Sequence, residues 1–150
     1  MRHRPSAPLV LTERADYALR SVLYLSRSNG AFVAAETVAG HYGMSTKMLA
    51  EVLRRLRRAG ILVAKTGSHG GFKLSQPAES IAVRSVIAAV DGSNEFAPPP
   101  VEAAAGSRDP VDEFWRSLDL NLKRMLDSFS VADLAAERTL CAHVVPSLSA

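Results

Sequence analysis

The apolar residues in the N-terminal part of the chain recur at helical spacing in three separate stretches. In each stretch leucine, valine or alanine returns every three or four residues and so falls on one face of a helix. This pattern predicts helices over residues 12–28, 34–42 and 45–59. Thr12 can cap the start of the first helix, and Gly60 can end the third in a left-handed conformation.

Two β-favouring runs, ILVAKT and FKLS, follow the third predicted helix. The five residues between them, 67–71, include three glycines, which can adopt the positive φ angles of a tight turn. The order predicts a β-hairpin, and the apolar spacing after it predicts a fourth helix over residues 79–91.

The pattern changes after residue 93. Residues 94–109 contain three consecutive prolines and no periodicity, which is typical of a linker or a loop. Asp109 and Pro110 then favour the start of a long helix to about residue 129, and residues 130–138 predict a short closing helix. The predicted fold class is therefore mainly α with one small β-hairpin.

The second and third predicted helices have the spacing of a DNA-binding helix-turn-helix. This motif requires a small residue in its first helix, a left-handed glycine four residues later, and apolar residues that hold the second helix. Ala39, Gly43, Leu49 and Val52 occupy those positions. The hairpin that follows makes the unit a winged helix, in which the hairpin is the wing. A generic helical hairpin with a basic face is the alternative interpretation.

In this register the start and one exposed face of the second motif helix would reach DNA, together with the wing. Lys47 could read a guanine edge, and the arginines further along would more naturally meet phosphates. Glu51 fits only if it accepts from a cytosine amine or stays clear of the backbone. The predicted DNA-binding residues are Ser45, Thr46, Lys47, Ala50, Glu51, Arg54, Arg55, Arg58, Lys65, Ser68, His69, Gly70 and Lys73.

The formal net charge of +3 conceals an asymmetry along the chain. Residues 41–90 carry 8 basic and 2 acidic groups, whereas residues 91–150 carry 5 and 10, so the two segments have net charges of +6 and −5. Such a difference is expected when one segment meets a polyanion and the other does not. An ion-paired surface facing solvent is the alternative explanation.

The glycine-rich stretch KTGSHGGFKL could also suggest a nucleotide phosphate loop. A phosphate loop leads from a strand through glycines into a helix, whereas here the glycines lead into a second strand-like run. The four histidines are scattered, and no pair has the helical spacing of a zinc site. We therefore predict no catalytic residue, no metal ligand and no enzyme activity.

The single cysteine, Cys141, excludes an intramolecular disulfide framework and favours a reducing compartment. No apolar run approaches the ~18 residues of a membrane-spanning helix. We expect a cytoplasmic protein without membrane contact, with residues 1–10 and 141–150 as disordered tails.

Three stretches of the chain resemble the Rrf2 family of bacterial winged-helix regulators: LTERADYALRSVLYL, GMSTKMLAEVLRRLRRAGIL and GSHGGFKLSQPAESIAVRSVIAAVDG. The resemblance implies a winged-helix DNA-binding domain over residues 11–92, a linker or sensor loop over 93–109, and dimerisation helices over 110–140. It also implies a homodimeric transcriptional repressor that binds a palindromic double-stranded operator.

The resemblance further implies that the long helix pairs with its copy. Its apolar stripe consists of Val111, Phe114, Trp115, Leu118, Leu122, Met125 and Leu126. The alternative is a module that has lost its sensor and uses the 110–129 helix to bind a different protein.

Many family members bind an iron–sulfur cluster through three cysteines of the sensor loop, and some add an oxygen ligand at the position of Asp16. Residues 93–109 contain no cysteine, and one thiol cannot hold a cluster alone. We therefore expect no iron–sulfur cluster and no other cofactor. The effector, whether a small molecule or a protein, and a redox role for Cys141 stay open.

Overall fold

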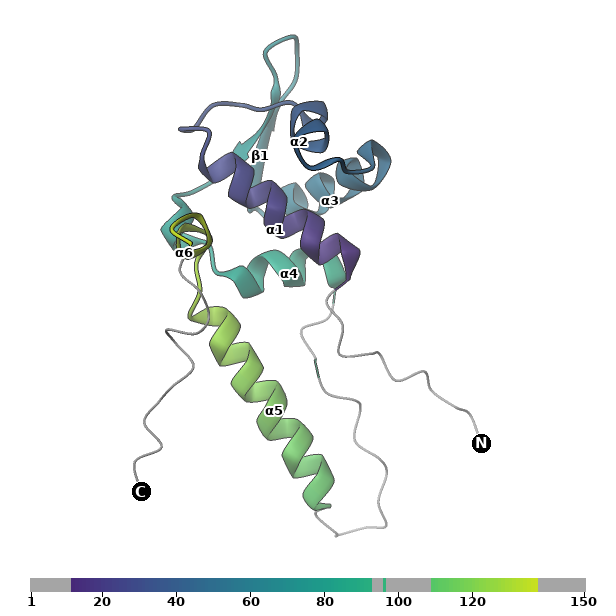
Figure 1. Cartoon of the computed structure of the whole chain (residues 1–150), viewed down its shortest axis with the longest axis vertical. Helices are drawn as coiled ribbons and strands as arrows, with labels where there is room; N and C mark the ends of the chain where they lie inside the picture. The colour runs from purple at the N-terminus through teal and green to yellow at the C-terminus, as the bar shows by residue number, and fades with distance from the viewer. Residues whose placement is uncertain (1–11, 93–95, 97–108, 138–150) are drawn as a thin grey trace.

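A computed structural model describes residues 12–92, 96 and 109–137 (Figure 1). The predicted tails and most of the predicted sensor loop lie outside these residues. In chain order the elements are α1 (Glu13–Ser26), α2 (Ala35–Tyr42), α3 (Thr46–Arg58), β1 (Leu62–Lys65), β2 (Gly71–Leu74), the 3₁₀ helix η1 (Ala78–Ser80), α4 (Val83–Asp91), α5 (Pro110–Asp127) and α6 (Val131–Ala135). This order confirms the predicted fold class, mainly α with a β-hairpin wing and a long C-terminal helix.

The helix ends follow from local capping chemistry. The Thr12 side chain accepts from the Ala15 N–H, and Asp109 accepts from the Val111 N–H at the start of α5. Ser130 and Asp133 form a reciprocal capping box at the start of α6. Gly43 ends α2 with a φ of 66°, the left-handed conformation predicted for the turn between the two motif helices.

The core is centred on α1, which packs against α3, α4, α6 and β2. Its largest fully buried side chains come mainly from α3, where Leu49, Leu53 and Leu56 are each 0% exposed. Burial of a leucine side chain stabilises the fold by about 1.5–3 kcal/mol, so this face of α3 is firmly fixed. The opposite face of α3 is left for other contacts.

The chain returns to this core after α5. Phe129 and Val131 are 4% and 0% exposed and belong to the same apolar cluster as α1. The Val83 N–H donates to the Phe129 carbonyl at 2.8 Å, and the Val131 N–H donates to the Ile81 carbonyl at 2.9 Å. The sequence grouped residues 110–140 as dimerisation helices, but residues 129–135 pack in the winged-helix core. We call residues 12–92 and 129–135 together the winged-helix unit.

The wing is an antiparallel pair in which Leu62 faces Leu74 and Lys65 faces Gly71. A third segment joins it, because Val33 and Phe72 exchange backbone hydrogen bonds of 2.9 and 2.8 Å. Gly71 has a φ of 140°, and a Cβ there would lie 2.2 Å from the Val33 carbonyl oxygen. The third segment therefore requires glycine at this position.

Two of the three wing glycines have the predicted positive φ, namely Gly67 and Gly71. Gly70 does not have a positive φ. Glycine is required there because a Cβ would lie 2.2 Å from the Lys65 carbonyl oxygen. Figure 1 shows the hairpin tip projecting beyond the helices, with α2 and α3 beside it.

Candidate DNA-binding surface

The start of α3 is held by two hydrogen bonds at Ser45. Its side chain accepts from the Met48 N–H at 3.4 Å, and its own N–H donates to the Tyr17 hydroxyl at 3.2 Å. The Ser45 hydroxyl thus caps the helix, and a tyrosine of α1 positions it. Thr46 and Lys47 follow with exposed side chains.

The exposed face of α3 carries a carboxylate between two arginines. Arg54 donates to Glu51 at 2.5 Å, and the Arg55 Nε donates to Glu51 at 2.8 Å. The hydrogen bond from Arg55 lowers the pKa of Glu51 below its ordinary value, aided by the positive charges of Arg54, Arg55 and Arg14 and opposed by partial burial. Glu51 is therefore ionised at neutral pH and offsets part of the positive charge of α3.

Arg14 was missed by the sequence analysis. It lies in the first turn of α1, and its charge acts on Glu51 of α3, so it adds a cation beside the predicted surface. No local pattern marks it, since the proximity arises from the packing of α1 on α3.

Arg55 has a second partner away from the exposed face. Its guanidinium donates to the Val90 carbonyl in the last turn of α4 at 2.9 Å. Its side chain is 34% exposed, against 60% for Arg54. An arginine that satisfies a helix C-terminal carbonyl stabilises that helix end. The geometry thus favours a structural role for Arg55, and its predicted phosphate contact stays a prediction.

The other predicted residues of α3 and the wing lie on the surface. Ala50 and Arg58 are exposed, and within the described residues Arg58 forms no ion pair. On the wing, Lys65, Ser68 and His69 are exposed, while Gly70 and Lys73 are half-buried.

Phe32 organises the two wing lysines. The Lys73 Nζ lies 4.8 Å from the centroid of the Phe32 ring, and the Lys65 Nζ lies 5.9 Å from it. These distances are within the range of cation–π attraction. Phe32 precedes Val33, whose backbone pairs with the wing, so the third segment also sets the positions of both lysines. No local pattern in the sequence indicates this contact.

The predicted dimerisation stripe on α5 is exposed at its N-terminal end. No residue of α5 is fully buried, and Val111 and Phe114 are 57% and 59% exposed. Trp115, Leu118 and Leu122 are half-buried, while Met125 and Leu126 pack against the winged-helix core. Among the described residues, the stripe packs on the winged-helix core at its C-terminal end.

That end of α5 is fastened to α4. Arg84 of α4 donates to Asp127 at 2.7 Å. In Figure 1, α5 extends from this attachment away from the rest of the winged-helix unit.

The Rrf2 family model, described as an iron-dependent transcriptional regulator, matches residues 11–137. The chain belongs to the Rrf2 family. The protein rrf2 of Nitratidesulfovibrio vulgaris is 30% identical over 135 residues, which cover 87% of this chain and 90% of that protein. The resemblance seen in the sequence is thereby confirmed.

Solved structures of regulators share the fold of this Rrf2 protein. CymR, the global cysteine regulator of B. subtilis, has a TM-score of 0.74 and 22% identity, over 87% of this chain and 98% of its own. The T. potens IscR has a TM-score of 0.73 and 19% identity, over 92% and 93%. Rrf2 proteins are DNA-binding transcriptional regulators, so the predictions of a regulator and of no enzyme are confirmed.

The family description names iron, but the side chains of this Rrf2 protein do not fit a cysteine-ligated cluster. Iron–sulfur clusters are held chiefly by several thiolates, and the chain has one cysteine, at position 141, outside the described residues. Asp16 instead accepts from the Arg20 Nε at 2.8 and 3.0 Å through its two oxygens. The residues that the structure describes contain no group of three metal-binding side chains and no helix long and apolar enough to cross a membrane.

Proposed function

We propose that this Rrf2-family protein is a homodimeric repressor that binds a palindromic operator and works without an iron–sulfur cluster. Two observations carry the proposal: α3 has an exposed polar start and the wing an exposed lysine, while α5 leaves Val111 and Phe114 of its apolar stripe exposed. The first feature supports a DNA-reading surface, and the second supports pairing with a second copy.

On DNA, the start of α3 would enter the major groove. Lys47 would then read a base edge, since it is exposed and belongs to the first turn of α3. Arg58, in the last turn of α3, and the wing lysines Lys65 and Lys73 would contact phosphates, because their positive charges lie on the same DNA-binding unit. Glu51 and Arg55, which form an ion pair with each other, would hold the shape of this surface without contacting a base.

In the dimer, the uncovered part of α5 would pack against the same part of a second copy. Phe114 and Trp115 supply the largest apolar surface there, with ring centroids 5.4 Å apart. Exposed apolar patches of this kind mark association sites. A two-fold dimer presents two α3 helices, which is why its operator would be palindromic.

The test of specific binding is fluorescence anisotropy with a duplex selected by the protein from a random pool, compared with a scrambled duplex. We expect the selected duplex to bind at least about 1,000-fold more tightly at physiological salt. Equal affinity for the two duplexes would refute specific operator binding.

Two variants separate base reading from backbone contact. Lys47→Ala should reduce discrimination at one base-pair position of each half-site by about 1–3 kcal/mol. Arg58→Ala should weaken all duplexes alike and lower the slope of log affinity against log salt by about 1. Arg116→Ala, on an exposed part of α5, is the charge-matched control. The reverse pattern between Lys47 and Arg58 would mean that α3 meets DNA in another register.

The uncovered stripe also suits the alternative of a different partner protein. Light scattering with size-exclusion chromatography distinguishes the two, because a homodimer has twice the mass of the chain. A monomer at dilute concentration would favour the heterologous partner.

A further inference from the structure

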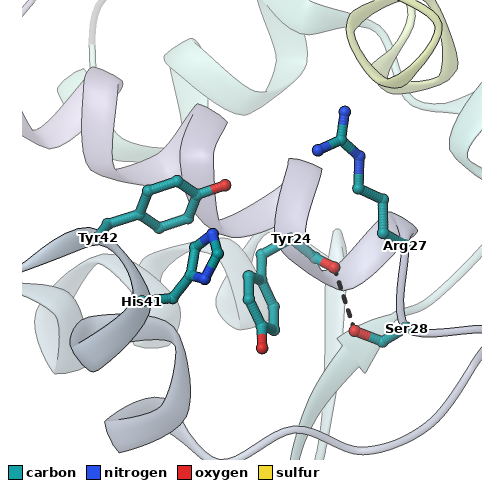
Figure 2. A pocket seen from close by; sticks show the side chains of 5 residues that line it. All are labelled: Tyr24, Arg27, Ser28, His41 and Tyr42. Atoms are coloured by element: carbon teal, nitrogen blue, oxygen red, sulfur yellow. Dashed lines mark hydrogen bonds between the residues drawn. The ribbon is translucent and has the colours of Figure 1, made fainter.

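A hollow of about 270 Å³ opens beside the C-terminal ends of α1 and α2. Tyr24, Arg27 and Ser28 line it from the end of α1, and His41 and Tyr42 line it from the end of α2 (Figure 2). It lies outside the surface assigned to DNA, and no predicted DNA-binding residue lines it.

Three aromatic rings form the wall of the hollow. The His41 ring lies 4.9 Å from the Tyr24 ring and 4.6 Å from the Tyr42 ring, both in edge-to-face arrangements. Arg20 stacks near Tyr42, with its guanidinium carbon 5.6 Å from the ring centroid. Such mutual contacts hold each ring in place, so the wall offers a preformed surface for a further flat ring.

The hollow carries an exposed cation, Arg27. Among the residues that the structure describes, no carboxylate lines the hollow and none forms an ion pair with Arg27. The hydrogen bond from Arg27 to the Ala135 carbonyl is 3.5 Å long, at the weak limit for such a bond. The fork of the Arg27 guanidinium is therefore available for a planar anion.

Further polar groups stand beside it. Figure 2 shows the Tyr42 hydroxyl, from the end of α2, and the Arg27 guanidinium, from the end of α1, among the side chains that line the hollow. Neither this hydroxyl nor the His41 ring hydrogen-bonds to any residue that the structure describes. Ser28 differs, because its hydroxyl donates to the Tyr24 carbonyl at 3.1 Å.

We propose that this hollow binds a small aromatic carboxylate. The carboxylate would accept from Arg27 and the Tyr42 hydroxyl, and the ring would pack on the aromatic wall. A few convergent polar groups on an apolar wall are the usual makeup of a small-molecule site. The volume suits a molecule with one ring.

The site lies where a ligand can act on the reading helix. Tyr42 directly precedes Gly43, the turn into α3, and Tyr17 of α1 holds the Ser45 N–H at the start of α3. A ligand between α1 and α2 thus bridges the two helices that position α3. If the protein binds an operator as proposed, ligand binding changes the affinity of the protein for that operator. The operator then changes the affinity of the protein for the ligand by the same factor.

The direct test uses benzoate as the probe, with the full chain and no DNA, by isothermal titration calorimetry. We expect saturable binding that is at least about tenfold weaker for the neutral benzamide and for Arg27→Gln, because each removes one half of a charge-assisted pair. Arg27→Lys keeps the charge and loses the fork, so it should bind with intermediate affinity. Arg116→Gln, on α5, should bind benzoate like the unaltered chain.

The absence of saturable benzoate binding would overturn the proposal, as would equal binding of benzoate and benzamide. Unchanged benzoate affinity in Arg27→Gln would do the same, once circular dichroism shows that this variant is folded. These measurements need no DNA, so they stand if the protein fails to discriminate between duplexes.

The regulatory part is tested by anisotropy with the selected duplex. Saturating benzoate should change the affinity of the protein for this duplex at least about threefold, which is a modest coupling between two sites. The change should vanish in Arg27→Gln. An unchanged affinity in the presence of bound benzoate would overturn this part alone.

Discussion

Helices α3 and α5 both carry an apolar stripe, but the stripe of α3 is buried whereas part of the stripe of α5 is exposed. Leu49, Leu53 and Leu56 of α3 are each 0% exposed, whereas Val111 and Phe114 of α5 are more than half exposed. The difference lies in the neighbours: α3 packs against α1, α2, α4 and β1, while α4 is the main neighbour of α5. An apolar stripe at helical spacing thus predicts a buried face, but the fold decides whether the same chain covers it.

The largest effect that this comparison predicts is at Leu53. Leu53→Ala should lower the free energy of unfolding by about 3–5 kcal/mol, because it leaves a cavity in a fully packed core. Leu120→Ala is the control on α5, where the side chain is 46% exposed, and its effect should stay below about 1 kcal/mol. Chemical denaturation measures both. Similar losses at the two sites would mean that α5 is buried in solution as deeply as α3.

The next effect concerns association. Leu118→Asp should raise the dissociation constant of the proposed dimer at least about 100-fold, because it places a charge in an apolar contact. Sedimentation equilibrium measures this constant. Leu120→Asp is the matched control, since two residues along a helix turn a side chain to the other face. If the two variants dissociate equally, the pairing face is not the predicted stripe.

A smaller effect tests the backbone contacts of the winged-helix unit. Gly71→Ala should destabilise the fold by about 2 kcal/mol, because its Cβ would collide with the Val33 carbonyl at a positive φ. Gly40→Ala, where a Cβ meets no atom within 4 Å, should stabilise α2 by about 0.5–1 kcal/mol. Thermal unfolding of both variants would show the opposite signs. A neutral Gly71→Ala would mean that Val33 does not pair with the wing in solution.

The smallest effect is the pH dependence of the stability that Glu51 of α3 contributes. The folded-state pKa of Glu51 is lowered, chiefly by the hydrogen bond from Arg55. Its contribution to stability is therefore present above the unfolded glutamate pKa of about 4.3 and is lost as the pH falls through the lower folded pKa. Glu51→Gln should lose stability less steeply than the unaltered chain in this acidic range, measured by urea unfolding. Arg55→Gln should show the same flattening, and identical slopes for all three proteins would contradict the pairing.

Much of the fold could be predicted from local pattern. Periodicity located the helices, and Gly43, Gly67 and Gly71 marked turns because few other residues adopt their backbone angles. The exposed start of α3, with Thr46 and Lys47, also followed from the spacing of its buried residues. These features depend on neighbours within a few positions in the chain.

The remaining features depend on residues far apart in the chain. The Arg55 contact to Val90 spans 35 residues, and the pairing of Val33 with Phe72 joins two segments of unlike composition. The hollow between α1 and α2 likewise exists only once both helices have packed. Sequence reasoning accordingly overlooked Arg14, Phe32 and the contact of Arg55 with Val90, and it did not foresee that residues 129–135 pack in the winged-helix core.

The return of the chain at Phe129 and Val131 has a consequence for how the protein can be divided. The core is discontinuous in sequence, since its last pieces lie beyond α5 and pack against α1 and η1. A fragment that stops after α4 would lack the side chains that seal one side of that core. The smallest piece expected to fold alone is therefore an excision in which a short linker replaces α5, and not a truncation at residue 92.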